Sequence, residues 1–240
     1  MKAPDGRPTI VFLHEGLGSV ALWRDFPRRV AEATRAGALV YSRYGNGRSD
    51  ALDAKRTVRY MHDEATLVLP EILRVLEIER PVLFGHSDGA SIALIYAGAV
   101  PTGALALVLE APHLFVEDLS VASIATMRER YEREGLRSKM LRYHRDVDAT
   151  FYGWNDIWLD PAFRTWNIEE SVRNVTAPVL ALQGADDEYG TLAQLEALRA
   201  GSAGSVDTLV LSDCGHAPHR DRTGFVEKAV ASWIAESAPY

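Results

Sequence analysis

The sequence has very little cysteine: Cys214 is the only one among 240 residues. A single thiol excludes an internal disulfide and is too few for a cysteine-based zinc or iron–sulfur site. We expect Cys214 to be a small buried filler, because free cysteine behaves as a small apolar residue. We also expect no metal and no organic cofactor.

Long apolar runs are missing as well. No stretch of about 18 apolar residues is present to span a bilayer, and no N-terminal segment joins a basic start to a long apolar core as a secretory signal does. We therefore expect no membrane association and a cytoplasmic location.

Positive charge is scarce relative to negative charge. Lys and Arg number 26 against 33 Asp and Glu, which gives a net charge of -7. Proteins that bind nucleic acid usually gather Lys and Arg on one face to neutralise phosphates. The composition argues against nucleic acid as a partner and favours a small-molecule substrate, with the chain acting as a monomer or a homodimer.

Short apolar runs bounded by turn residues predict buried strands. They are TIVFL at 9–13, ALVYS at 38–42, PVLF at 81–84, LALVLEAP at 105–112, PVLAL at 178–182 and VDTLVL at 206–211. Helical periods of apolar residues lie between them, at 61–76 and 226–234, and Pro70 predicts a kink or a late start in the first. The alternation predicts an α/β fold, a three-layer α/β/α arrangement around a doubly wound, mostly parallel sheet.

The alternation stops between residues 113 and 176. This segment carries charged helical stretches followed by the aromatic-rich FYGWNDIWLDPAFRTWNI. We expect a helical cap at 113–176, inserted between two parts of the α/β core, 1–112 and 177–240.

The stretch GHSDG at 85–89 stands between a predicted strand and a predicted helix. A serine on such a tight turn needs neighbours that are nearly free of side chains, which explains Gly85 and Gly89. The turn also places Ser87 at a helix N-terminus, where backbone amides favour developing negative charge. We therefore expect Ser87 to be a nucleophile.

A nucleophilic serine needs a base, and the base needs an orienting acid. His216 follows the last predicted strand and is the leading base. Asp186 and Asp187 both follow the strand before it, and from the residues alone either could be the acid. For the oxyanion hole we expect the amides of Asp88, which follows the nucleophile, and of Gly16, in the glycine-rich loop after the first strand.

Five motifs together resemble the α/β-hydrolase superfamily, in its branch of small enzymes with a cap between strands six and seven. They are HEGLGS, YGNGRSD, GHSDG, QGADD and CGHAPH, in that order. The resemblance implies a serine hydrolase, and the Gly-x-x-Asp spacing of its acid motif selects Asp187. Two features depart from the family pattern. Glu15 stands where a glycine usually follows the histidine at position 14, and the hairpin that usually precedes the first strand is missing, which would expose a sheet edge or leave it to a partner chain.

We expect a substrate pocket formed by the oxyanion loop, the cap and the end of a central strand. Its predicted lining residues are Glu15, Leu17, His113, Trp154 and Trp158. Such pockets are mostly apolar with few polar groups, and the aromatic cap fits a modest apolar substrate.

Two further polar residues belong to the same region of the predicted fold. His14 is expected to brace the oxyanion loop through hydrogen bonds. Glu110, at the end of a predicted strand, is an alternative acid, because some members of the superfamily carry the acid there.

These residues predict hydrolysis of a carboxylic ester or thioester through an acyl-enzyme. Hydrolysis of a carbon–carbon bond in a diketone, or perhydrolysis, would use the same triad. A ligand-binding protein that keeps the fold but has little turnover is the alternative from another class.

Overall fold

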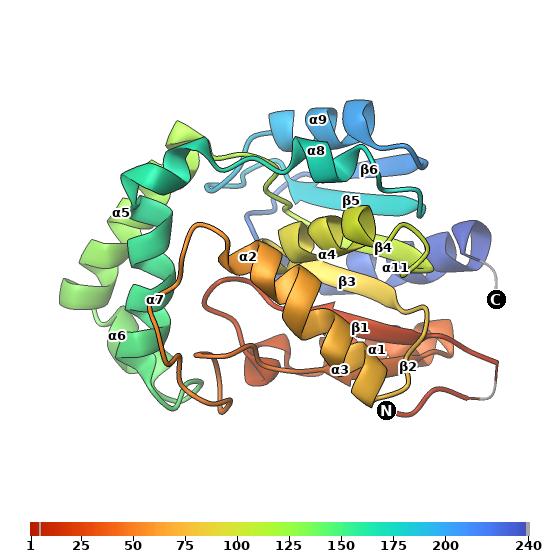
Figure 1. The fold of residues 1–240 in the computed structure, drawn as a ribbon, viewed down its shortest axis with the longest axis horizontal. Helices are drawn as coiled ribbons and strands as arrows, with labels where there is room; N and C mark the ends of the chain where they lie inside the picture. Colours follow the sequence, from red (N-terminus) through yellow and green to blue (C-terminus); the bar gives the residue numbers. More distant parts are fainter. Residues whose placement is uncertain (5, 239–240) are drawn as a thin grey trace.

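The computed structural model describes residues 1–4 and 6–238 of the chain. In this part of the chain, a parallel sheet has the strand order β2-β1-β3-β4-β5-β6 (Figure 1). The strands are β1 (Thr9–Leu13), β2 (Gly37–Val40), β3 (Val82–His86), β4 (Ala106–Glu110), β5 (Val179–Gly184) and β6 (Val206–Leu211). Each strand overlaps one of the predicted apolar runs. The predicted α/β fold class is therefore confirmed.

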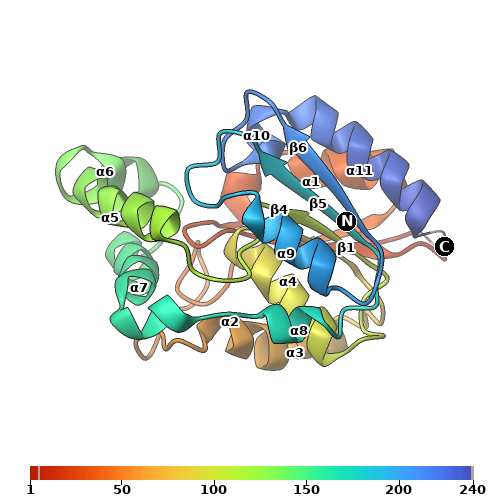
Figure 2. The ribbon, with the colours of Figure 1, turned by 90° about the horizontal axis from the view of Figure 1, so that it is seen from above.

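Helices cover both faces of the sheet (Figure 2). Because successive strand residues point to opposite faces, Ile10 and Phe12 of β1 pack on one side and Val11 and Leu13 on the other. The first side is covered by α1 (Phe26–Thr34) and α11 (Thr223–Ser237). The second is covered by α2 (Tyr60–Asp63), α3 (Leu69–Val75), α4 (Asp88–Ala99), α8 (Glu169–Val172) and α9 (Ala193–Gly201). Short helices η1 (Val20–Trp23) and α10 (Pro218–Asp221) occupy connecting loops.

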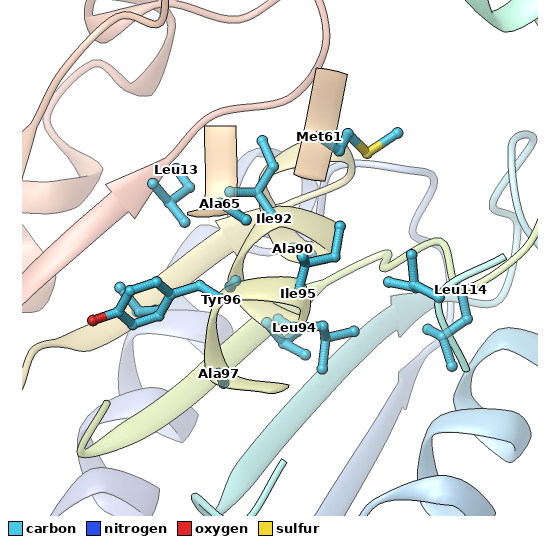
Figure 3. Packing of buried hydrophobic residues seen from close by; sticks show 14 of the residues in the cluster. Leu13, Met61, Ala65, Ala90, Ile92, Leu94, Ile95, Tyr96, Ala97 and Leu114 are labelled. Carbon is cyan, nitrogen blue, oxygen red and sulfur yellow. The ribbon is translucent and has the colours of Figure 1, made fainter. Parts of the chain in front are cut away.

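Helix α4 is apolar on all sides because it lies in the middle of the core. Ala90, Ile92, Leu94 and Ile95 are almost fully buried between the sheet and the neighbouring helices, and Met61 packs nearby (Figure 3). This burial explains why small and aliphatic residues follow the GHSDG turn directly.

The helical period at 61–76 contains a wider turn than the pattern alone predicts. A π-helical segment, Glu64–Val68, joins α2 to α3, and Pro70 falls in the first turn of α3. Proline has no amide hydrogen to donate within a helix, yet the helical path runs without interruption from Tyr60 to Val75, so the late start that Pro70 predicts is not seen.

Most of the segment between β4 and β5, before α8, forms a group of helices beyond the carboxyl ends of the strands (Figures 1 and 2). These are α5 (Asp118–Arg133), α6 (Leu136–Met140), α7 (Val147–Leu159) and η3 (Pro161–Thr165). They pack on one another through aromatic rings, including Tyr131 stacked on Phe151 with centroids 3.7 Å apart. We call α5, α6, α7 and η3 the cap helices.

The outer edge of β2 meets the start of the chain. Ala38 exchanges two backbone hydrogen bonds with Met1, of 2.8 and 2.9 Å. Among the described residues, no helix combines the length and the apolar character needed to cross a bilayer.

Candidate active site

Ser87 occupies a strained turn between β3 and α4. Its φ of 54° and ψ of -119° lie outside the regions that residues with a side chain usually adopt. A Cβ on Gly85 would lie 2.5 Å from the Gly89 carbonyl oxygen, and one on Gly89 would lie 2.0 Å from that of Leu13. Both glycines of the motif are therefore required by close backbone approach.

A chain of hydrogen bonds starts from the Ser87 hydroxyl. Its Oγ lies 2.9 Å from His216 Nε2, and His216 Nδ1 lies 2.8 Å from Asp187 Oδ1. The carboxylate can only accept, so Nδ1 carries a hydrogen and Nε2 is free to accept from the serine. Burial alone would raise the pKa of Asp187, but the hydrogen bond from His216 and the charge of its ring outweigh it and lower that pKa. The structure thus brings together the three residues predicted to act as nucleophile, base and acid.

The loops that carry the acid and the base touch each other. A Cβ on Gly184 would lie 2.1 Å from the carbonyl oxygen of Cys214, two residues before His216. The Tyr189 amide donates to Asp187 Oδ1 over 2.8 Å. The side chain of Asp186, by contrast, is exposed, which leaves Asp187 as the aspartate facing the imidazole.

The alternative acid, Glu110, has a different partner. Its buried carboxylate lies 2.5 Å from His219 Nδ1, whereas His216 faces Asp187. Cys214 is also buried, and burial raises the pKa of its thiol to about 11, so the thiol stays protonated at neutral pH.

The loop after β1, in which we expect the oxyanion amide of Gly16, is held by hydrogen bonds to its backbone. His14 Nε2 accepts from the Arg43 amide at 3.0 Å, so its Nδ1–H donates to the Glu15 carbonyl at 2.6 Å. Asn46 Nδ2 donates to the Gly16 carbonyl at 3.0 Å. Burial, with the nearby charge of Arg43, lowers the pKa of His14 to about 3, so this brace is a neutral imidazole.

The side chain of Asp88 connects the turn at residues 85–89, which we call the elbow, to the cap helices. Its carboxylate accepts from the Tyr60 hydroxyl at 2.7 Å and from Trp158 Nε1 at 3.3 Å, and it lies 3.7 Å from the Arg43 guanidinium. These contacts fix the residue whose amide we expect in the oxyanion hole. Sequence reasoning missed Tyr60 and Arg43, because nothing in the local pattern pairs either with Asp88.

A cavity of about 490 Å³ lies over Ser87. It is lined by Gly16, Asp88 and all five predicted pocket residues: Glu15, Leu17, His113, Trp154 and Trp158. The loop backbone passes so close under the cap that a Cβ on Gly16 would lie 2.1 Å from Trp154 Nε1. Burial, with the charge of His216, lowers the pKa of His113 to about 4.

A second group of ionisable side chains lies behind the triad. Donor atoms of His86, Glu110 and His219 come within 4.8 Å of one another, a spacing that could suit a cation. However, Glu110 is hydrogen-bonded to His219, and His86 Nε2 donates to the carbonyl oxygen of His216 at 2.7 Å. Because Glu110 already holds His219 and His86 already holds the His216 backbone, we do not assign the three residues as metal ligands. Sequence reasoning also missed His86 and His219.

Comparison with solved structures finds the same architecture. An alpha/beta hydrolase enzyme from a Medee basin deep-sea metagenome library superposes with a TM-score of 0.77 and 18% identity, covering 98% of this chain and 92% of that one. The enol-lactonase from Burkholderia xenovorans has a TM-score of 0.75 and 18% identity, with coverages of 98% and 95%. A 2-hydroxy-6-oxo-6-phenylhexa-2,4-dienoate hydrolase from Rhodococcus has a TM-score of 0.76 and 14% identity, with coverages of 94% and 90%.

Sequence comparison is consistent with this likeness. No curated protein matches the chain. A family model described as "Alpha/beta hydrolase family" matches residues 10–229, which include all of the described sheet except Thr9, the first residue of β1. The chain belongs to the alpha/beta hydrolase family.

Proposed function

We propose that this protein is a serine hydrolase that cleaves a carboxylic ester or thioester of a small apolar acyl group. The observation that carries the proposal is the run of hydrogen bonds from Ser87 through His216 to Asp187, at 2.9 and 2.8 Å, beside the cavity. Nucleophile, base and orienting acid are thereby in contact in the order that acyl transfer requires.

Each residue has one role in the proposed reaction. Ser87 Oγ attacks the acyl carbonyl while His216 Nε2 takes its proton, and the amides of Gly16 and Asp88 stabilise the oxyanion. The imidazolium, stabilised by Asp187, then gives the proton to the leaving alcohol or thiol. Water, deprotonated by His216, attacks the acyl-enzyme, and the carboxylic acid leaves as Ser87 is regenerated.

The lining of the cavity supports a modest apolar acyl group. Beyond the five predicted residues, Ile124, Met127 and Met140 of the cap region contribute apolar surface. A volume of about 490 Å³ falls within the usual range of small-molecule sites. We further propose that α5, α6, α7 and η3, within residues 113–176, act as the cap of this site, whereas α8 of the same segment covers the sheet.

A panel of p-nitrophenyl esters and acyl-CoA thioesters tests the proposal. We expect Ser87→Ala to lower kcat at least about 10³-fold on any ester that the parent hydrolyses, because the nucleophile is lost. Ser212→Ala, at an exposed serine in the loop after β6, is the matched control and should keep the parent rate. A fluorophosphonate should label Ser87 in the parent, which peptide mapping would locate.

The same panel separates the alternatives. A vinylogous diketone is included because hydrolysis of a carbon–carbon bond uses the same triad; turnover of the diketone alone would replace the ester proposal. Absence of Ser87-dependent turnover on every substrate would favour a ligand-binding protein. Labelling at a residue other than Ser87 would overturn the site.

A further inference from the structure

Glu15 and His86 form a largely buried pair next to Ser87. His86 ends β3 immediately before Ser87 and is only 2% exposed. Its Nε2 lies 2.7 Å from the carbonyl oxygen of His216, which can only accept, so Nε2 carries a hydrogen. Its Nδ1 lies 3.5 Å from Glu15 Oε2. Both ring nitrogens therefore face acceptors, an arrangement that suits a ring protonated on both.

The charges around His86 favour its protonated form. Two carboxylates face His86: Glu15, from the loop after β1, and Glu110, from β4. Two histidine rings also lie next to it: His219, from α10, and His216, from the loop after β6. Burial by itself lowers the pKa of His86, but the hydrogen bond and charge of Glu15, with the charge of Glu110, outweigh burial and raise it. Burial likewise opposes ionisation of Glu15, yet contact with His86 holds the pKa of that carboxyl well below its usual range.

The pair connects the two loops on which the reaction depends. Glu15 directly precedes Gly16, whose amide is proposed for the oxyanion hole, and His86 reaches the backbone of the base itself. A rigid link here would fix the separation of Gly16, Ser87 and His216, and a misplacement of about 1 Å can cost on the order of 100-fold in rate.

We propose that Glu15 and His86 are positioning residues, which together hold the backbone of His216 in register with Ser87 and the oxyanion loop. This inference rests on the proposed serine-hydrolase function. It also gives a physical reason for the glutamate at a position where the family pattern has glycine: the carboxylate is the counter-charge of His86.

Two substitutions at His86 separate its hydrogen bond to the His216 carbonyl from its ion-pair contact with Glu15. A glutamine amide nitrogen can approach the place of Nε2, whereas an asparagine amide nitrogen replaces only the Nδ1 side of the ring. We expect His86→Asn to lower kcat about 10- to 100-fold with KM changed less than about twofold, and His86→Gln to recover most of the loss. His62→Asn, in α2 beside Trp166, is the matched control. Equal kcat in both His86 variants and the parent, or a loss confined to KM, would overturn the proposal.

The charge of the pair is tested without turnover by NMR titration of the His86 ring. We expect its pKa to lie above 6.5 in the parent and to fall in Glu15→Gln, which keeps the size of the side chain but removes its charge. The control is Glu71→Gln, at an exposed glutamate of α3. Because protonated His86 is the form that makes both contacts, kcat should fall at alkaline pH, and this limb should move to lower pH in Glu15→Gln.

The two proposals fail in different ways. Normal Ser87-dependent turnover with a His86 pKa that is unshifted, or that does not respond to Glu15→Gln, would reject the positioning pair alone. A raised His86 pKa that depends on Glu15, in a protein without Ser87-dependent turnover, would reject the hydrolase function, and with it the catalytic role of the pair.

Discussion

The acid of the proposed triad can be tested against its own neighbour. Asp187→Asn should lower kcat on the order of 10⁴-fold, because an amide no longer holds the imidazole in the tautomer that accepts the serine proton. Asp186→Asn is the matched control, since that side chain is exposed and it is Asp187 that is hydrogen-bonded to His216. Steady-state kinetics on one ester substrate would show the difference, and an equal loss in both variants would contradict the assignment.

For individual residues, the sequence predicted those that belong to local motifs and missed those that do not. Ser87, Asp187 and His216 each follow a strand within a recognisable local pattern, so they could be named before their geometry was known. Tyr60 and Asp88 are 28 residues apart, and His86 and His216 are 130 apart. No spacing rule links such pairs, because only the fold brings them together. For the residues that surround Ser87, Asp187 and His216, the sequence offered one signal, the unusual glutamate at position 15.

The backbone of the elbow is closely packed against β1. Gly89→Ala would push a methyl group to 2.0 Å from the Leu13 carbonyl oxygen, and neither β1 nor α4 can move away without disturbing the core. We expect it to lower the free energy of unfolding by about 1–3 kcal/mol, the usual cost of overpacking, and to reduce labelling of Ser87 by a fluorophosphonate.

Gly224, at the start of α11, serves as the control position for Gly89. A Cβ on Gly224 meets nothing within 4 Å, so Gly224→Ala should leave activity intact and stabilise the helix by up to about 1 kcal/mol. Urea unfolding followed by circular dichroism would compare the two variants with the parent. Equal effects at both positions would mean that the elbow is less constrained than its contacts indicate.

Elements were predictable where burial alone decides their pattern. The inner strands β1, β3, β4 and β5 are buried, nearly continuous apolar runs, and every predicted run overlaps a strand of the described sheet. The π-helical turn before Pro70 and the break between α5 and α6 at Gly135, where φ is 77°, were not predicted. The π-helical turn and the break at Gly135 depend on local backbone conformation. The spacing of apolar residues carries no information about that conformation.

At the scale of the whole molecule, the buried histidines make stability depend on pH. The pKa values of His14 and His113, about 3 and about 4, lie below the value near 6.5 expected in the unfolded chain. As pH falls below 6.5, the unfolded chain therefore binds protons that the folded protein refuses, so acidification favours unfolding. His86, whose pKa is raised, acts in the opposite direction: its contribution is complete below pH 6.5 and is lost as pH rises through its folded pKa. Asp187, whose pKa is lowered, keeps its contribution at any pH above about 4.

We therefore expect the free energy of unfolding to fall between pH 7 and pH 5. At pH 5, each of the two neutral histidines would cost about 2 kcal/mol, of which His86 offsets part. Urea unfolding of the parent and of His113→Gln at several pH values would measure the slope. Because glutamine does not titrate, the variant should lose less stability than the parent over the same interval. A parent whose stability is constant or rises on acidification, or a variant with the parent's slope, would show that these imidazoles accept protons inside the fold. A protonated His113 would then stand 5.7 Å from the ring of His216 and compete with the charge that the proposed mechanism places there.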